Sequence, residues 1–130
     1  MPERVDIAIV GAGPYGLSVA AHLAGRSVRT FGEPMETWRT RMPPYMLLRS
    51  DWRETSLSAP GDHGTIDRWA QEADEEREEP IPLQKFLRYA GWFRHTFVPE
   101  GDSSDVVALD RAARGIGPDA VEVLVEEELV

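Results

Sequence analysis

The hydrophobic residues of this chain begin in a β-type run and then change to helical spacing. Residues 5–10 are mostly apolar and rich in β-branched side chains, which predicts a buried strand of a parallel sheet. Apolar residues then recur at helical spacing and stop at Gly25: Leu17, Ala20, Ala21 and Ala24. Residues 27–31 predict a second strand. The order strand, helix, strand predicts a parallel βαβ unit.

The middle of the chain is predicted to be largely helical. Pro34 to Arg41 predicts a short helix that begins at its proline, and Thr65 predicts an N-cap for a second helix. The second helix carries one apolar face: Ile66, Trp69, Ala70 and Ala73. A stronger amphipathic pattern follows: Leu83, Phe86, Leu87, Ala90 and Phe93. The segments 42–46 and 56–64 are expected to be loops, because proline and glycine interrupt both.

Short strands are predicted in the last third of the chain, at His95–Pro99, Val106–Leu109 and Val121–Val125. Turns are expected at Gly101–Ser104 and Gly115–Asp119, where small and polar residues gather. The sequence shows no internal repeat and no low-complexity linker. We therefore expect residues 1–130 to form one domain.

A glycine turn joins the first strand to the first helix. Its sequence is Gly11-Ala12-Gly13-Pro14-Tyr15-Gly16, which matches G-x-G-x-x-G. The first glycine allows a tight turn, the second allows phosphates to approach the backbone, and the third allows the helix to pack on the strand. The helix N-terminus then presents unpaired N–H groups to an anion. This arrangement suits the pyrophosphate of a dinucleotide.

Glu33 follows the predicted second strand, 22 residues after Gly11. An acidic side chain at about this distance binds the ribose hydroxyls of a dinucleotide. The fold class that these features predict is α/β. It is a Rossmann-like parallel sheet with a βαβ start, a helical insertion and short additional strands.

Composition narrows the function classes. The net charge of −9 argues against nucleic-acid binding, and the acidic runs at 72–79 and 126–128 are expected to be solvated. The absence of cysteine excludes disulfides, thiolate metal sites and a cysteine nucleophile. We see no secretory leader and no apolar run long enough for a membrane span. A cytoplasmic protein is therefore expected.

The remaining polar and aromatic residues suggest no second site. His22, His63 and His95 are too scattered to predict a metal site. Ser58 lies near Asp62 and His63, but no G-x-S-x-G turn surrounds a serine, so a hydrolytic triad is not predicted. Three tryptophans are expected in the core: Trp52, Trp69 and Trp92. Trp38 is instead expected beside a cofactor.

The residues together resemble a known family. The glycine turn, Trp38 five residues after Glu33, and the segment 42–50 are similar to those of flavin-dependent monooxygenases. The spacing of Pro82, Phe86 and the following aromatics also resembles that group. The group includes flavin-containing, Baeyer–Villiger and N-hydroxylating enzymes and related FAD/NAD(P)-dependent oxidoreductases. The resemblance covers roughly residues 4–110.

The resemblance implies FAD as the cofactor and a role for each matched residue. Five residues would hold the FAD pyrophosphate: Gly11, Gly13, Pro14, Tyr15 and Gly16. Glu33 would bind the adenosine ribose, and its charge would repel a 2′-phosphate. Trp38 would lie along the flavin side. The loop that contains Met46 and Arg49 would approach the isoalloxazine ring, and Gln84 would reach that ring from the start of a helix. Val98 would lie at the adenine edge. No catalytic side chain is implied, because the cofactor performs the difficult step.

The chain also departs from the family pattern. A second glycine turn for NADPH is missing, since Gly115–Asp119 has neither the strand nor the helix that such a turn needs. Tyr45 stands where glycine is expected, and the closing strand of the FAD domain is absent. The final segment 120–130 leaves the pattern. We therefore expect the first third of such an enzyme, as a fragment, a split-gene half or a decayed copy, inactive alone.

Three hypotheses follow. The first is the FAD-binding portion of a monooxygenase-like oxidoreductase that uses NAD(P)H, with a second polypeptide completing the enzyme. The second is a stand-alone NAD-binding protein, which Glu33 allows but which gives the segment 38–50 no role. The third is a non-catalytic relic or interaction module whose incomplete sheet leaves an exposed edge.

Overall fold

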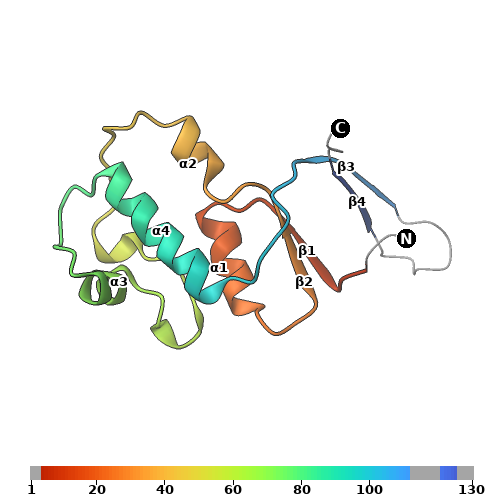
Figure 1. The fold of residues 1–130 in the computed structure, drawn as a ribbon, viewed down its shortest axis with the longest axis horizontal. Helices are drawn as coiled ribbons and strands as arrows, with labels where there is room; N and C mark the ends of the chain where they lie inside the picture. Colours follow the sequence, from red (N-terminus) through yellow and green to blue (C-terminus); the bar gives the residue numbers. More distant parts are fainter. Residues whose placement is uncertain (1–3, 112–120, 126–130) are drawn as a thin grey trace.

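A computed structural model describes residues 4–111 and 121–125 (Figure 1). Its elements in chain order are β1 (Ile7–Val10), α1 (Pro14–His22), β2 (Val28–Phe31), α2 (Glu36–Thr40), η1 (Arg53–Thr55), η2 (Pro60–Asp62), α3 (Ile66–Ala73), α4 (Leu83–Phe97), β3 (Val106–Arg111) and β4 (Val121–Val125). The helices gather on one side of the parallel strands, and the β3–β4 hairpin extends from the other (Figure 1).

The βαβ start is confirmed. β1 pairs with β2 in parallel, with Ile7 opposite Val28 and Val10 opposite Phe31. α1 connects the two strands and ends at His22, and the N–H of the following Leu23 bonds back to the last turn. Gly25 then adopts a positive φ of 91°, which suits the glycine that the sequence places after the helix.

A third extended segment lies beside β2. Asp102 pairs in parallel with Phe31, and its N–H donates to the Thr30 carbonyl at 2.8 Å. The Gly32 N–H in turn donates to the Asp102 carbonyl at 2.8 Å. The spatial order is therefore the Asp102 segment, β2, β1. This order is that of one half of a Rossmann-like sheet, which confirms the predicted fold class.

The strand predicted at His95–Pro99 is wrong, because α4 continues to Phe97. Aromatic packing explains the difference: the Phe97 ring centroid lies 5.2 Å from that of Phe93 and 5.5 Å from that of Trp92. These contacts need helical spacing, so the extended chain begins only at Val98. The predicted turn at Gly101–Ser104 also includes the strand pairing of Asp102.

The helix predicted from Pro34 begins later than expected, at Glu36. Met35 adopts a left-handed φ of 56°, and its N–H donates to the Ala12 carbonyl at 2.9 Å. This bond ties the segment after β2 to the glycine turn. Because Met35 is not in a helical conformation, α2 begins only at the next residue, Glu36.

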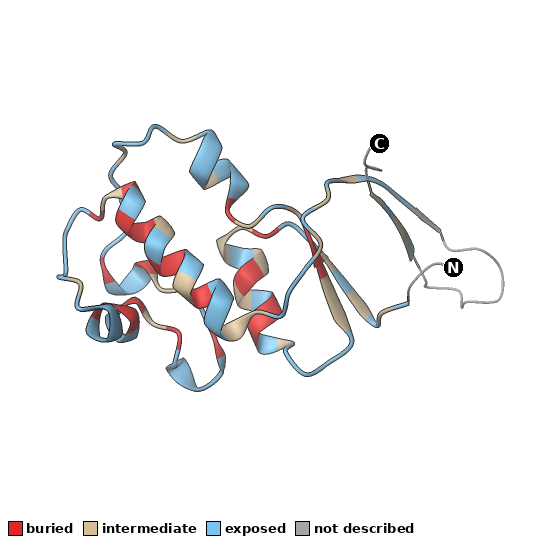
Figure 2. Cartoon of the chain, in the orientation of Figure 1, coloured by how far each residue is buried: buried red, intermediate tan, exposed pale blue. Residues whose placement is uncertain are grey.

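The core lies between α1, α3 and α4 (Figure 2). Its largest fully buried side chains are Trp52, Tyr89, Phe93, Leu17, Ile66, Ile81 and Leu83. Trp52 and Trp69 are buried as predicted, and the half-buried Trp92 packs against the core. Thr65 caps α3 as predicted, because its Oγ1 accepts the Arg68 N–H at 3.2 Å.

The parallel strands are less covered than the sequence predicts. β1 alternates half-buried and exposed positions, and Val10 is 54% exposed. α1 packs on one face, whereas no described element covers the other. β1 therefore differs from the fully buried strand that its apolar residues predict.

β3 and β4 form a separate antiparallel hairpin, with Val106 opposite Val125. β4 has the predicted bounds, and β3 extends two residues further than predicted. The predicted turn at Gly115–Asp119 and the acidic run at 126–128 lie outside the described residues.

Candidate functional site

The glycine turn has the geometry that its sequence predicts. Gly11 has a φ of 108°, which L side chains rarely adopt, and its N–H donates to the Phe31 carbonyl at 2.9 Å. A Cβ at Gly16 would overlap the carbonyl oxygen of Gly11, so only glycine lets α1 pack against the turn. A Cβ at Gly13 would meet nothing within 4 Å. The space outside Gly13 is therefore open to a ligand.

Among the described residues, no side chain caps the N-terminus of α1. Gly13 is the N-cap, no side chain caps the helix, and its first turn carries no acidic residue. Pro14 contributes no N–H. The positive end of the helix dipole thus faces open space, which favours an anion. Tyr15 projects from this turn and is 89% exposed.

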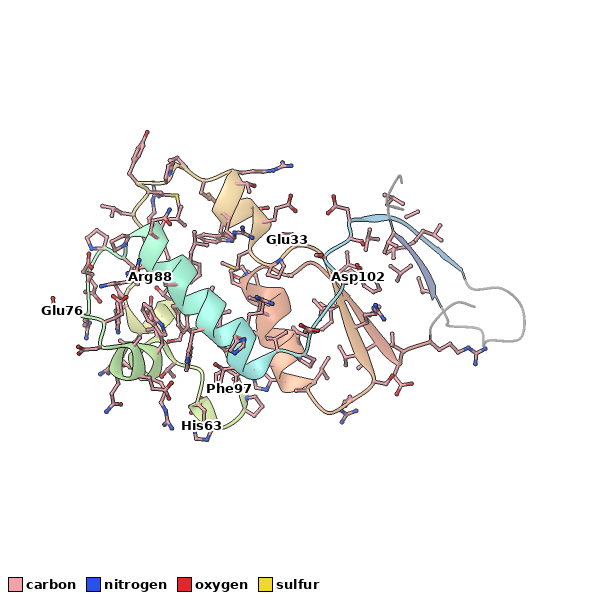
Figure 3. The ribbon with its side chains drawn as sticks, in the orientation of Figure 1. Glu33, His63, Glu76, Arg88, Phe97 and Asp102 are labelled. Atoms are coloured by element: carbon pink, nitrogen blue, oxygen red, sulfur yellow. The ribbon has the colours of Figure 1, made fainter. Side chains whose placement is uncertain are left out.

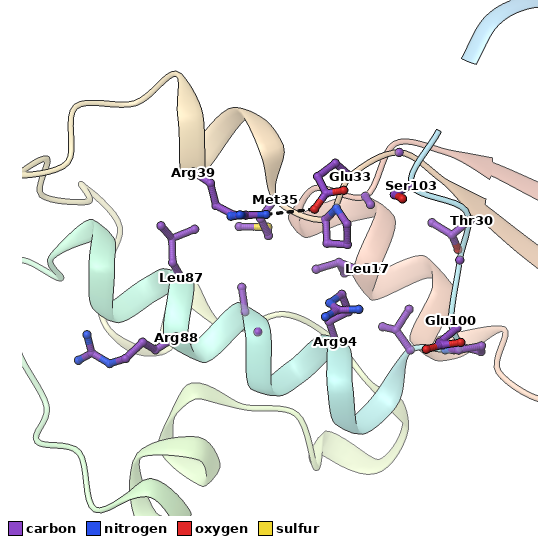
Figure 4. A pocket seen from close by; sticks show the side chains of 18 of the residues that line it. Leu17, Thr30, Glu33, Met35, Arg39, Leu87, Arg88, Arg94, Glu100 and Ser103 are labelled. Atoms are coloured by element: carbon purple, nitrogen blue, oxygen red, sulfur yellow. Dashed lines mark hydrogen bonds and ion pairs between the residues drawn. The ribbon is translucent and has the colours of Figure 1, made fainter. Parts of the chain in front are cut away.

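A pocket of about 780 Å³ lies beside the turn (Figure 4). It is lined by Ala12, Leu17, Thr30, Gly32, Glu33, Pro34, Met35, Arg39, Gln84, Leu87, Arg88, Ala90, Gly91, Arg94, Val98, Pro99, Glu100, Gly101 and Ser103. The pocket thus lies at the carboxyl end of β2, between α1, the segment after β2, α4 and the segment 98–103. Ligands of open α/β sheets bind at this end of the strands.

Glu33 lines this pocket, and it has a partner that the sequence analysis missed. The Arg39 Nη1 lies 3.2 Å from the Glu33 Oε1 (Figure 4). Both side chains are about half exposed. The bond uses one carboxylate oxygen, so Oε2 has no protein donor among the described residues. Arg39 follows Trp38 on α2, and its six-residue spacing from Glu33 offered no familiar signal.

The predicted site residues divide into those at the pocket and those away from it. Glu33, Gln84 and Val98 line it. The glycine turn reaches it through Ala12. Trp38, Met46 and Arg49 are not among its lining residues.

The residues away from the pocket have other contacts. The Trp38 ring packs on Phe86, with 5.1 Å between ring centroids. Met46 packs against the core, and its carbonyl accepts the Leu83 N–H at 2.9 Å. Arg49 is exposed. The pocket therefore encloses the side where the adenosine was expected. Of the residues expected beside the flavin, it reaches Gln84 but not Trp38, Met46 or Arg49.

The acids near the end of β2 have different surroundings. Hydrogen bonds from Ser104 hold the pKa of Asp102 below its ordinary value, and Arg29 lies 3.8 Å from the Asp102 Oδ2. Asp102 is thus kept ionised by its own segment. Glu33, labelled with it in Figure 3, instead borders the pocket.

Other polar clusters lie elsewhere. Ser58 forms a hydrogen bond with His22 at 2.7 Å, and no bond joins it to His63 among the described residues. His63 lies on the opposite side of α4 from Glu33 (Figure 3). Within the ranges 4–111 and 121–125, no group of three or more His, Cys, Asp or Glu side chains is placed to hold a metal. No helix there is long and apolar enough to cross a membrane.

Solved structures share this fold. A bacillithiol disulfide reductase from Staphylococcus aureus matches 98% of this chain and 35% of its own, with a TM-score of 0.71 and 16% identity. An ornithine N-hydroxylase from Kutzneria, solved with reduced FAD, NADP⁺ and L-ornithine, matches 95% of this chain and 33% of its own. Its TM-score is 0.72 and its sequence identity is 21%. An L-lysine 6-monooxygenase from Pseudomonas syringae matches 94% of this chain and 34% of its own, with a TM-score of 0.69 and 15% identity.

The TM-scores establish a shared fold, and identities this low show no more than the fold. The resemblance to flavin-dependent monooxygenases is confirmed at that level. The chain spans about a third of the length of these three proteins. A scan against protein-family models finds no match. A search of curated proteins finds no relative.

Proposed function

We propose that this chain is the FAD-binding portion of a flavin-dependent, NAD(P)H-using oxidoreductase of the monooxygenase type. The observation that carries the proposal is the pocket that joins the glycine turn to Glu33. Its volume of about 780 Å³ is within the usual range for ligand sites. Residues 1–130 form one partial FAD-binding domain in this proposal.

The pyrophosphate binds at the glycine turn. Gly13 leaves open space, Gly16 brings α1 close, and the helix N-terminus favours the negative charge. Gly11, Pro14 and Tyr15 complete the turn. Glu33 accepts hydrogen bonds from the ribose hydroxyls through Oε2, the carboxylate oxygen that Arg39 does not contact. Val98 borders the adenine, at the start of the segment that pairs with β2.

The flavin end extends toward the start of α4. Gln84 lines the pocket there, and its Nε2 lies 3.4 Å from the Pro44 carbonyl, in the segment that precedes Met46. Trp38, Met46 and Arg49 border the flavin on its open side. FAD, when bound, supplies the redox chemistry. The residues of this chain bind and orient it, and we assign no catalytic side chain.

The oxidoreductase class has more support than the monooxygenase type. The structures of similar fold include a disulfide reductase as well as two monooxygenases. Trp38 and the segment 42–50 favour the monooxygenase type by resemblance. The chain spans about a third of those proteins. We propose that residues 1–130 bind FAD but do not turn over by themselves, because the NAD(P)H-binding part of such an enzyme lies outside them. In this proposal a second polypeptide supplies that part in the cytoplasm.

A stand-alone NAD-binding protein is the alternative, because Glu33 and the glycine turn would serve the adenosine end of either dinucleotide. Titration separates the two. Purified chain is mixed with FAD, and the quenching of flavin fluorescence is followed; NADH is titrated in parallel. We expect saturable FAD binding that is tighter than NADH binding. Tighter NADH binding would support the alternative, and absence of binding to both would reject the proposal.

A further inference from the structure

Three arginines line the pocket, and two of them have carboxylate partners. Arg39 pairs with Glu33 at 3.2 Å, and Arg88 pairs with Glu75 at 3.1 Å. The side chain of Arg94 makes no ion pair or hydrogen bond with any residue of the ranges 4–111 and 121–125. Glu100 belongs to the same lining but forms no ion pair with it.

The direction of Arg94 sets it apart from Arg88, which is also on α4. Figure 4 shows Arg94 extending from the last turns of α4 toward Leu17, into the space below the segment that carries Glu33. Arg88 points away, along the outer side of the helix (Figure 4). Arg94 therefore presents its guanidinium to whatever fills the pocket.

The neighbours of Arg94 suit an aromatic base better than a phosphate. Two apolar lining residues lie at this end of the pocket: Leu17, toward which Arg94 extends (Figure 4), and Val98, which follows the last turn of α4. Apolar walls favour a flat ring with apolar faces. The phosphate position is already served by the N-terminus of α1. A guanidinium is planar and stacks on aromatic rings, which a lysine ammonium does less well.

We infer that Arg94 is the base contact of the dinucleotide: its guanidinium packs against the adenine ring, on the far side of the ribose from the glycine turn. This inference rests on the proposed FAD site and adds a residue that the sequence pattern did not suggest. Arg94 is thus a positioning residue for the adenosine half. It discriminates ligands that carry a purine from those that do not.

The test uses the full chain and four variants: Arg94→Ala, Arg94→Tyr, Arg94→Lys and Arg88→Ala. FAD affinity is measured by fluorescence quenching, and AMP affinity by calorimetry. Circular dichroism checks that each variant folds. We expect Arg94→Ala to weaken the binding of FAD and of AMP by the same factor, about 3- to 30-fold. Arg94→Tyr should restore most of the affinity, because its ring also stacks on a base.

Arg88→Ala is the matched control. Arg88 lines the same pocket on the same helix but points outward, so its removal should leave both affinities unchanged. Arg94→Lys separates charge from stacking, since it keeps the charge and loses the flat guanidinium. The inference requires Arg94→Lys to bind more weakly than the natural chain.

Each other result overturns the inference. If the natural chain binds FAD and Arg94→Ala binds it equally well, Arg94 makes no contact while the proposed function stands. If Arg94→Lys binds like the natural chain and Arg94→Tyr like Arg94→Ala, the guanidinium contacts a phosphate instead of the base. If the natural chain binds neither FAD nor AMP, the proposed function fails and the inference fails with it.

Discussion

At the scale of single residues, the glycine turn contains two positions with different tasks. A Cβ at Gly16 would meet protein, because the carbonyl oxygen of Gly11 occupies that place. A Cβ at Gly13 would meet only open space, and the backbone there, with φ −80° and ψ −170°, accepts any residue. Gly16 is therefore required by the fold, and Gly13 is required only by a ligand.

This difference gives a paired prediction. Gly16→Ala is expected to lower the free energy of unfolding by about 1–3 kcal/mol, because α1 must move away from the turn. Gly13→Ala should leave the melting temperature nearly unchanged. It should weaken FAD binding about tenfold or more, because the added methyl group enters the space that the phosphates would occupy. Thermal melts and FAD titrations of both variants measure this. Equal FAD affinity in Gly13→Ala would contradict the proposed phosphate position.

The residue scale also shows what spacing alone reveals. Glu33 was found because an acid about 20 residues after a glycine turn has a known role. Arg39 and Arg94 were not found, because nothing in their local sequence marks them. Arg39 reaches Glu33 only after the backbone reverses at Met35, and Arg94 reaches the pocket only because α4 crosses beside α1.

At the scale of elements, α4 organises the molecule through a buried tyrosine. The Tyr89 hydroxyl donates to the Gly64 carbonyl at 2.6 Å and accepts the Leu57 N–H at 2.7 Å. It thus joins α4 to the segment between η1 and α3. Burial raises the pKa of Tyr89 to about 12.

The pH dependence follows from that shift. The folded chain favours the neutral phenol, so its contribution to stability is complete below pH 10 and is lost as the pH rises toward about 12. Tyr89→Phe should unfold about 1–3 kcal/mol more easily at pH 7, because Gly64 and Leu57 lose their partner. It should also lose part of the alkaline dependence. Urea unfolding at pH 7 to 11 tests both, and an unchanged pH dependence would contradict the role of Tyr89.

Element boundaries were predicted well where one residue decides them. Thr65 caps α3, and Gly25 follows α1, because local hydrogen bonds or φ angles select these residues. The end of α4 was misplaced because His95–Pro99 has strand-like composition. Packing of Phe97 on Phe93 and Trp92 outweighs that local preference.

At the scale of the whole molecule, the β3–β4 hairpin exposes apolar side chains. Four of them are at least 40% exposed: Val107, Leu109, Val121 and Leu124. Val10 of β1 is also exposed, at 54%. Exposed apolar strands favour pairing with another chain, while the net charge of −9 opposes association in dilute salt.

We therefore expect association that depends on concentration and grows when salt screens the charge. The double variant Val107→Thr and Leu109→Ser should reduce this association, because hydroxyl groups replace the exposed apolar surface of the hairpin. Val19→Thr is the control, since Val19 is exposed apolar surface on α1 and not on a strand. Sedimentation velocity over a range of protein concentrations measures this in 0.5 M salt, where the screening length is about 4 Å. A monomer at every concentration would contradict it.

The sequence by itself determined the βαβ start, the glycine turn, the acidic residue after β2 and the cap of α3. Each of these depends on residues close together in the chain, through spacing, φ angles or local hydrogen bonds. Only the tertiary structure decided that Arg39 meets Glu33, that Arg94 enters the pocket, that Trp38 packs on Phe86 and that α4 extends to Phe97. These depend on contacts between segments distant in sequence, where packing against a neighbour outweighs local preference.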